Sequence, residues 1–195
     1  MNRWFTVIFK TGIMDTMSFE HGCMLVLGGA KSGKSRFAMD ACNALARKSI
    51  FLATAQALDR EMEERILRHR SERGSEWLTV EEPIELASAI RTTDKQDTVI
   101  LVDCLTLWLN NLFMKYRDER EKIDRNIDDL VNQLSYVRGV VVVVSNEVGM
   151  GIVPEDELSR RYRDAAGLLN QRVAGVADRV VAILAGQPLV VKDSG

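Results

Sequence analysis

Residues 28 to 35 read GGAKSGKS, and this stretch decides the fold. It follows the apolar run MLVL, residues 24 to 27, and leads into KSRFAMDACNALAR, residues 34 to 47, whose pattern predicts a helix. Glycine, serine and lysine bury little apolar surface, so burial does not explain their place directly after a predicted strand. The pattern GxxxxGK(S/T) between a strand and a helix is typical of a phosphate-binding loop, the P-loop.

The chemistry of this loop follows from its backbone. Glycines let the chain wrap tightly, so that successive N–H groups point at phosphate oxygens, aided by the positive end of the following helix. We expect Lys34 to neutralise the β- and γ-phosphates as a catalytic residue, and Ser35 to place its hydroxyl on Mg²⁺. An ordinary glycine-rich turn is the alternative, but here pattern and context match together. The predicted nucleotide-binding residues are Gly28, Gly29, Ala30, Lys31, Ser32, Gly33, Lys34 and Ser35.

Apolar runs rich in β-branched residues recur along the rest of the chain. Continuous runs of this length suit strands that are buried on both faces, as in parallel sheets. Predicted helices lie between most of them, which indicates one α/β domain, a mostly parallel sheet flanked by helices. The predicted strands are residues 24–28, 49–55, 76–80, 98–104, 140–146 and 179–186, with 188–192 closing, and the predicted helices include 34–47, 60–73, 83–90 and 121–137.

Composition narrows the class of protein. With 195 residues, 46% of them hydrophobic, the chain can form one core of ordinary size. The formal charge is −2 and the basic residues are scattered among acidic ones, so nucleic acid is not an expected partner. Cys23, Cys42 and Cys104 lack CxxC spacing, which disfavours disulfides and zinc and fits a reducing cytoplasm.

The first 22 residues stand apart from this pattern. They contain the apolar run WFTVIF, which is short for a signal peptide, and no convincing cleavage site follows. No stretch of the chain approaches the roughly 20 apolar residues that span a bilayer. We expect residues 1–22 to be an extension outside the domain, either disordered or a start-site artefact, and residues 23–195 to be the domain.

A second acidic group is expected near the loop, because P-loop enzymes usually hold their metal ion with a carboxylate at the end of a neighbouring strand. The run TVILVD ends in Asp103, which we take as that metal ligand; capping the helix that follows is its alternative role. A guanine-reading NKxD motif is absent, which disfavours a switch GTPase. A small-molecule kinase is then the default expectation.

Two longer segments carry a resemblance to a known family. The segment from Asn146 to Val180, NEVGMGIVPEDELSRRYRDAAGLLNQRVAGVADRV, resembles the C-terminal signature of the bifunctional adenosylcobinamide kinase/adenosylcobinamide-phosphate guanylyltransferase family of cobalamin biosynthesis. Residues 53–77, ATAQALDREMEERILRHRSERGSEW, resemble the family's central region. With GGAKSGKS and VDCLTLWLNNL, the match runs from about residue 24 to the end and implies a P-loop NTPase fold of the RecA-like type.

The resemblance implies two reactions. ATP or GTP phosphorylates the hydroxyl of the aminopropanol arm of adenosylcobinamide. GTP then gives its GMP to an enzyme histidine with release of pyrophosphate, and the cobinamide phosphate takes the GMP to form adenosylcobinamide-GDP. The implied partners are the corrinoid, the two nucleotides, Mg²⁺ and further copies of the chain, commonly in a homotrimer.

The histidine falls on one residue. The chain has two histidines, His21 in the extension and His69 in RILRHRSER, where the family's guanylylated histidine lies. Trp77 at its expected distance supports this register. Imidazole has an unperturbed pKa of about 6.5, so it is largely neutral and nucleophilic at cytoplasmic pH. Judged from the segment alone, His69 is expected to pack with Ile66 on an apolar helix face. The resemblance reverses that judgement in favour of the nucleophile.

Other positions are carried over from the family. They are nucleotide contacts at Ala53, Thr54, Ala55, Arg70, Ser71, Glu72, Arg73, Glu81 and Asp103. Asn146 and Glu147 end a strand at the carboxyl edge, where α/β sheets bind ligands. Asp103 and Glu147 both stay candidates for the base of the kinase step.

Alternatives from other classes remain open. A monofunctional P-loop kinase would phosphorylate without forming a GMP adduct, and a non-enzymatic nucleotide-gated switch would bind nucleotide without turnover. The apolar segment LTLWLNNLFMKY, with Trp108, Leu109, Leu112 and Phe113, fits a subunit interface and a well-buried helix equally well.

Overall fold

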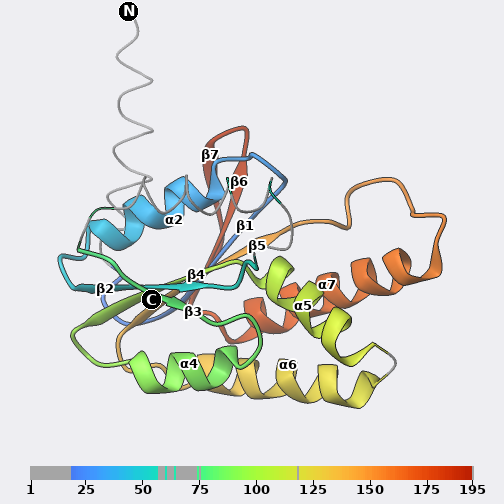
Figure 1. Ribbon diagram of the computed structural model, residues 1–195. Helices are drawn as coiled ribbons and strands as arrows, with labels where there is room; N and C mark the ends of the chain where they lie inside the picture. Colours follow the sequence, from blue (N-terminus) through green and yellow to red (C-terminus); the bar gives the residue numbers. More distant parts are fainter. Residues whose placement is uncertain are drawn as a thin grey trace, which may run out of the picture.

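The protein is one seven-stranded sheet with helices on both faces, as seen in a computed structural model that describes residues 19–56, 60, 64, 74, 76–117 and 119–194 (Figure 1). Its elements in chain order are β1 (Gly22–Gly28), α2 (Lys34–Asn43), β2 (Lys48–Ala53), β3 (Leu78–Glu81), α4 (Leu86–Thr93), β4 (Thr98–Asp103), α5 (Leu105–Tyr116), α6 (Arg120–Leu134), β5 (Val140–Asn146), α7 (Glu157–Val176), β6 (Arg179–Leu184) and β7 (Gln187–Asp193).

The strand order is β3-β2-β4-β5-β1-β6-β7. Every neighbouring pair is parallel except β6 and β7, which form an antiparallel pair at one edge. The mostly parallel α/β sheet predicted from the apolar runs is therefore confirmed. Parallel pairing follows because each crossover carries a helix or a long connection back to the starting edge. As a result, the carboxyl ends of six strands meet at one edge of the sheet.

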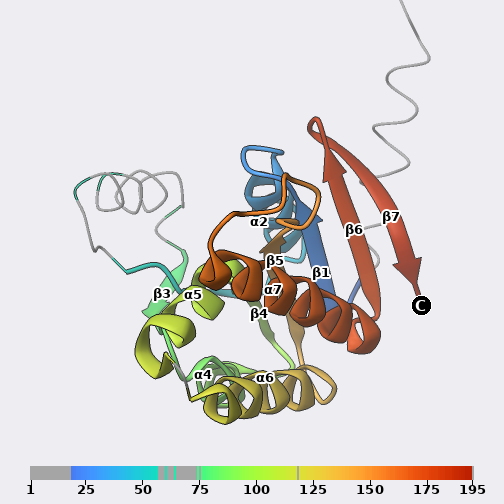
Figure 2. The same ribbon diagram turned by 90° about the vertical axis from the view of Figure 1, so that its right-hand side faces the viewer.

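The helices divide unequally between the two faces of the sheet. Figure 2 shows α2 on one face and α4, α5, α6 and α7 on the other. Two apolar cores fill the space between sheet and helices, one under α2 and a larger one under the four other helices. The run Val140–Val144 contributes to both, because successive residues of a strand point to opposite faces. A strand buried on both faces accounts for five consecutive valines.

Helix α5 resolves the two readings of its apolar segment. Trp108 is 1% exposed, and Leu109 and Leu112 are fully buried inside the chain. The indole Nε1 of Trp108 donates to the carbonyl of Ile84, 2.8 Å away. These three side chains therefore belong to a well-buried helix. Phe113 is only partly buried, and its ring packs edge-on against Tyr162.

The packed structure begins before the boundary expected at residue 23. Strand β1 starts at Gly22, and Phe19 is 8% exposed and packs in the core under α2. The guanidinium of Arg179 lies over the Phe19 ring, 5.5 Å from its centre. The expected extension therefore includes residues that pack in the domain, because the Phe19 ring buries its apolar surface in the core under α2. His21 is exposed, and residues 1–18 lie outside the described part of the chain.

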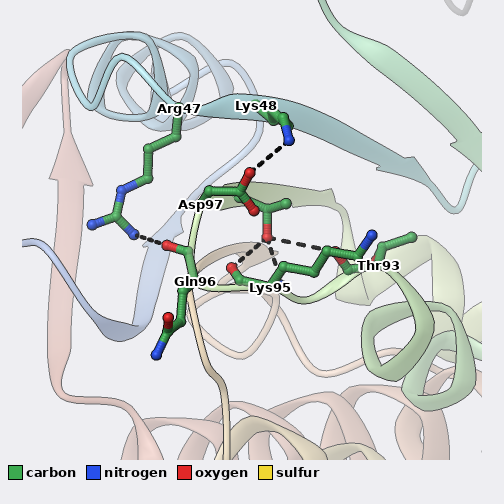
Figure 3. Close-up of polar contacts among 7 residues, drawn as sticks. Arg47, Lys48, Thr93, Lys95, Gln96 and Asp97 are labelled. Carbon is green, nitrogen blue, oxygen red and sulfur yellow. Dashed lines mark hydrogen bonds and ion pairs between the residues drawn. The ribbon is translucent and has the colours of Figure 1, made fainter.

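The amino ends of β2 and β4 are joined by polar contacts on the side of the sheet opposite to its carboxyl edge (Figure 3). Lys48 Nζ lies 2.6 Å from Asp97 Oδ2, and Arg47 Nη1 donates to the carbonyl of Gln96 at 3.1 Å. Both contacts are exposed, and an exposed ion pair such as Lys48–Asp97 contributes little to stability. Their effect is to support the register in which Lys48 lies beside Thr98.

Candidate functional site

The loop between β1 and α2 has the backbone shape that its glycines allow. Gly33 caps α2 with φ 97°, a left-handed conformation that glycine adopts without strain. Gly28 sits where a side chain would not fit, because an added Cβ would lie 2.8 Å from the carbonyl oxygen of Ile183. The N-terminus of α2 therefore opens directly onto the loop, as anion binding at a helix end requires.

Lys34 and Ser32 point polar atoms into this loop. The Lys34 side chain is 8% exposed, and its Nζ donates to the carbonyl of Gly29 at 3.0 Å. Ser32 Oγ is buried without a hydrogen-bond partner among the described residues. A buried hydroxyl that lacks a partner is costly, and a phosphate oxygen would satisfy it. The loop residues thus fit the polyphosphate that the sequence pattern predicts.

Sheet register brings the acidic candidates to the same edge. Ala53 at the end of β2 lies beside Glu81 of β3 on one side and Asp103 of β4 on the other. Gly28 at the end of β1 lies beside Asn146 of β5. Residues far apart in the sequence therefore form one row along the carboxyl edge, at the mouth of the phosphate loop.

A pocket of about 540 Å³ lies between this edge and α2. It contains both Ser35 and Asp103, the two predicted metal ligands, which belong to different elements. Its other lining residues are Arg36, Met39, Asp40, Asn43 and Phe51. The pocket is where a nucleotide held by the loop would extend, since it starts at the N-terminus of α2.

The residues of this pocket fit Mg²⁺. A serine hydroxyl and a carboxylate offer the hard oxygen donors that Mg²⁺ prefers, and this ion is usually held by one or two carboxylates together with substrate phosphates. Ser35 and Asp103 line the same pocket and would hold the ion there. Asp40 lies further along α2 in the same pocket.

The side chain of Thr54, a predicted nucleotide contact, is bonded within the protein. Its side chain is fully buried, and its hydroxyl donates to the Cys104 carbonyl and accepts from the Cys104 N–H, both at 2.8 Å. The amide of Asn111 donates to the Thr54 carbonyl at 2.8 Å. Thr54 therefore clamps the chain that follows Asp103. Burial, followed in size by the Asp103 carboxylate, raises the pKa of the Cys104 thiol to about 11, so that thiol stays neutral.

The end of β5 is fixed to the phosphate loop. Glu147 N donates to the carbonyl of Gly28 at 3.1 Å, and Asn146 N donates to Thr106 Oγ1 at 2.8 Å. Asn170 of α7 holds the same strand end, because its amide donates to the Asn146 carbonyl and accepts from Ser145 Oγ. Of the two candidate bases, Asp103 lines the pocket, whereas Glu147 Oε1 accepts from Gly149 N at 3.0 Å.

The predicted nucleophile lies outside the described residues. This applies to His69 and to the four positions after it, Arg70, Ser71, Glu72 and Arg73, and to most of the helix predicted over 60–73. Trp77, at the far end of this segment, is described: its Nε1 donates to Asn43 Oδ1 at 3.1 Å and its ring meets Phe51 edge-on. Both partners of Trp77 line the pocket of Ser35 and Asp103.

Sequence reasoning missed the α2 side of the pocket. Met39 and Asn43 follow Ser35 at intervals of four residues, so they lie on the same helix face. Once Ser35 was predicted to bind the metal ion, this four-residue spacing could have predicted that Met39 and Asn43 line the same pocket. Phe51 carried no such signal, because it lies within an apolar run of four residues, 50–53, that has no polar marker. Of the other predicted nucleotide contacts, Ala55 is partly buried just beyond β2, and Glu81 is exposed at the end of β3.

Comparisons with known proteins identify one family over most of the chain. The family described as cobinamide kinase / cobinamide phosphate guanyltransferase matches residues 24–191. A bifunctional adenosylcobalamin biosynthesis protein, CobP, of Pseudomonas aeruginosa is 44% identical over 86% of this chain and 96% of its own length. Proteins of the same description, named CobU, are 39% identical in Salmonella typhimurium and 37% in Escherichia coli, over 87% of this chain and 99% of theirs.

Solved structures support the fold alone. The secretion ATPase EscN of enteropathogenic E. coli aligns with a TM-score of 0.54 at 12% identity, over 84% of this chain and 43% of its own. A prototypical type III secretion ATPase gives 0.51 at 13% identity, over 83% of this chain and half of its own length. These similarities are those of a P-loop NTPase domain, while the sequence relatives share nearly the whole chain. The chain therefore belongs to the cobinamide kinase / cobinamide phosphate guanyltransferase family.

Proposed function

We propose that the chain is a bifunctional enzyme of adenosylcobalamin biosynthesis. It phosphorylates adenosylcobinamide with ATP or GTP, and it then transfers GMP from GTP to the product to give adenosylcobinamide-GDP and pyrophosphate. The observation that carries this proposal is a phosphate loop with Lys34 turned inward, in a chain that matches the family from residue 24 to residue 191. The nucleotide contacts assigned to residues 28–35 are part of it.

In the kinase step, the substrate hydroxyl attacks the γ-phosphorus, the bond to the β-phosphate bridging oxygen breaks, and the proton passes to a carboxylate. The loop N–H groups and Lys34 stabilise charge on the phosphate oxygens. Asp103 is our choice for contacting the nucleotide's metal ion together with Ser35. Bound Mg²⁺ would supply charge neutralisation at the phosphates.

In the transfer step, we propose that His69 is the nucleophile. Its imidazole nitrogen attacks the α-phosphorus of GTP, the P–O bond to pyrophosphate breaks, and a P–N bond to GMP forms. A phosphate oxygen of cobinamide phosphate then attacks the same phosphorus, and the imidazole leaves. Two displacements through an enzyme nucleophile divide one difficult transfer into two easier ones. Arg70, Ser71, Glu72 and Arg73 are proposed GTP contacts next to this nucleophile, with Ala53, Ala55 and Glu81 at the sheet edge.

The test is covalent labelling with GTP that carries ³²P in its α-phosphate. We expect an acid-labile, base-stable label on the wild type, and none on His69→Asn or when Mg²⁺ is omitted. His21→Asn is the matched control, because His21 is an exposed histidine outside the pocket, and it should label like the wild type. Labelling of His69→Asn at the wild-type level would overturn the assignment of the nucleophile.

The same preparation separates the alternatives. His69→Asn should still phosphorylate adenosylcobinamide, since the kinase step uses the loop. Phosphorylation by the wild type without any GMP adduct would identify a monofunctional kinase, and nucleotide binding without turnover would identify a switch.

We also propose a homotrimer in a reducing cytoplasm. Three free cysteines, all buried, are compatible with that compartment. In the described part of the chain, no helix has both the length and the apolar character that crossing a membrane demands. Sedimentation velocity should give three times the mass of one chain, and a monomer at working concentration would contradict the trimer.

A further inference from the structure

The loop that joins β5 to α7 exposes an unusual amount of apolar surface. Met150 is 86% exposed, Ile152 is 95% exposed and Val153 is 60% exposed. All three lie in the run MGIV, which carries no charge. Single exposed apolar residues are ordinary, but three in four consecutive positions beside a binding site indicate a contact surface.

This loop is held at both ends. At its start, Glu147 N donates to the carbonyl of Gly28, the first residue of the phosphate loop, at 3.1 Å. At its end, Arg160 donates to the carbonyls of Pro154 and Glu155, and Asp156 caps α7 by accepting from Ser159 N. The apolar side chains are therefore presented by a loop whose two ends are hydrogen-bonded to their surroundings.

Position connects the loop with the reaction. The loop leaves the carboxyl end of β5, where Asn146 lies beside Gly28 of β1, and then runs outward to the start of α7 (Figure 1). Met150 follows Glu147 by three residues, so its Cα lies within about 11 Å of that anchor. An acceptor whose hydroxyl reaches the γ-phosphate must bring the rest of its bulk close to this rim.

We propose that residues Met150–Val153 form the contact surface for the corrin macrocycle of the acceptor. This inference rests on the proposed kinase function. A corrinoid presents methyl groups and uncharged amide chains around a large ring, which matches the uncharged, apolar run MGIV. At Gly151 no atom lies within 4 Å of an added Cβ, so its backbone groups are open to hydrogen bonds with the amides. The anionic nucleotide does not suit this surface, and its ligands are in the phosphate loop.

The test compares Met150→Ser/Ile152→Ser with the wild type. Equilibrium dialysis of cobinamide, at saturating non-hydrolysable GTP analogue, should give a dissociation constant at least about tenfold higher for the variant, because two apolar contacts are lost. Binding of a fluorescent GTP analogue should change less than twofold. In the kinase assay, KM for cobinamide should rise while kcat stays within about threefold, because binding in the ground state and the transition state is lost equally.

The matched control is Tyr136→Ser. Tyr136 is 80% exposed and precedes β5, so it lies at the opposite end of that strand from the loop. This variant should bind cobinamide like the wild type, which excludes a general effect of removing exposed apolar surface. Both variants alter exposed side chains, so circular dichroism should report a native fold for each.

The outcomes are distinguishable. If the wild type binds and phosphorylates cobinamide and the loop variant does so equally well, the loop assignment is overturned and the proposed function stands. If the wild type neither binds nor phosphorylates cobinamide, the proposed function fails and the inference with it. If the loop variant instead changes the sedimenting mass, the surface is a contact between copies of the chain, which also overturns the assignment.

Discussion

Replacing Thr54 by valine removes one buried hydroxyl at the edge of the site and leaves the shape of the side chain nearly unchanged. That hydroxyl makes two hydrogen bonds of 2.8 Å to the backbone of Cys104. The Cys104 carbonyl keeps a second donor, Trp108 N at 3.1 Å. The Cys104 N–H has no other partner among the described residues, so the substitution leaves a buried donor unsatisfied.

The expected loss of stability follows from these lost hydrogen bonds. An unsatisfied buried donor costs about 1–3 kcal/mol, and the loss of one of two bonds to a carbonyl adds less. We therefore expect Thr54→Val to lower the free energy of unfolding by about 2 kcal/mol. For a chain of this length that corresponds to roughly 4–8 °C in the melting temperature. Thr54→Ser keeps the hydroxyl and loses one buried methyl group, which costs about 1 kcal/mol.

The assay is urea unfolding followed by tryptophan fluorescence, with the kinase reaction measured on the same samples. Cys104 follows Asp103, so a loosened Cys104 should also raise the Mg²⁺ concentration needed for half-maximal activity in Thr54→Val, but not in Thr54→Ser. The order of stability is the decisive result. If Thr54→Val is as stable as Thr54→Ser or more so, the hydroxyl does not hold this turn and the reasoning is refuted.

Two further substitutions test the loop and α7. Gly28→Ala should lower the melting temperature and weaken nucleotide binding, because the added methyl group meets a backbone oxygen. Gly29→Ala should leave the melting temperature unchanged, since no atom lies within 4 Å of an added Cβ. Equal melting temperatures of the two variants in calorimetry would contradict this prediction. The Ser159 contact lowers the pKa of Asp156 from its ordinary 3.8. The ionised carboxylate therefore stabilises the fold above that pH, and this contribution is lost as the pH falls through the lower folded pKa. The melting-temperature difference between wild type and Asp156→Asn should shrink below about pH 4; a difference independent of pH would show that charge is not involved.

Much of the fold could be predicted because the local signals agree with the tertiary structure. The strand over 140–146 was predicted with its observed bounds, because a continuous run of valines is typical of a strand buried on both faces. The first strand was predicted two residues short, because Gly22 and Cys23 carry no strand pattern of their own. Pairing with Val140 and Val141 makes them part of the sheet, and that pairing is long-range.

The site divides in the same way. The roles of Lys34 and Ser35 could be predicted from eight consecutive residues and stay predictions, because the phosphate loop is a local structure whose glycines and helix start determine its shape. The role of Thr54 could not, since its partner Cys104 is fifty positions away and meets it only when β2 and β4 pair. The same holds for the pocket that brings Asp103 to Ser35.

The sequence by itself determined that this chain holds a phosphate loop within an α/β sheet, because loop geometry and apolar periodicity act over a few residues. Only the tertiary structure decided which side chains meet at the carboxyl edge and which ones form the hydrogen bonds that stabilise that edge. The physical reason is that strand order and register are chosen by burial of the whole sheet, and no short stretch of sequence contains that information.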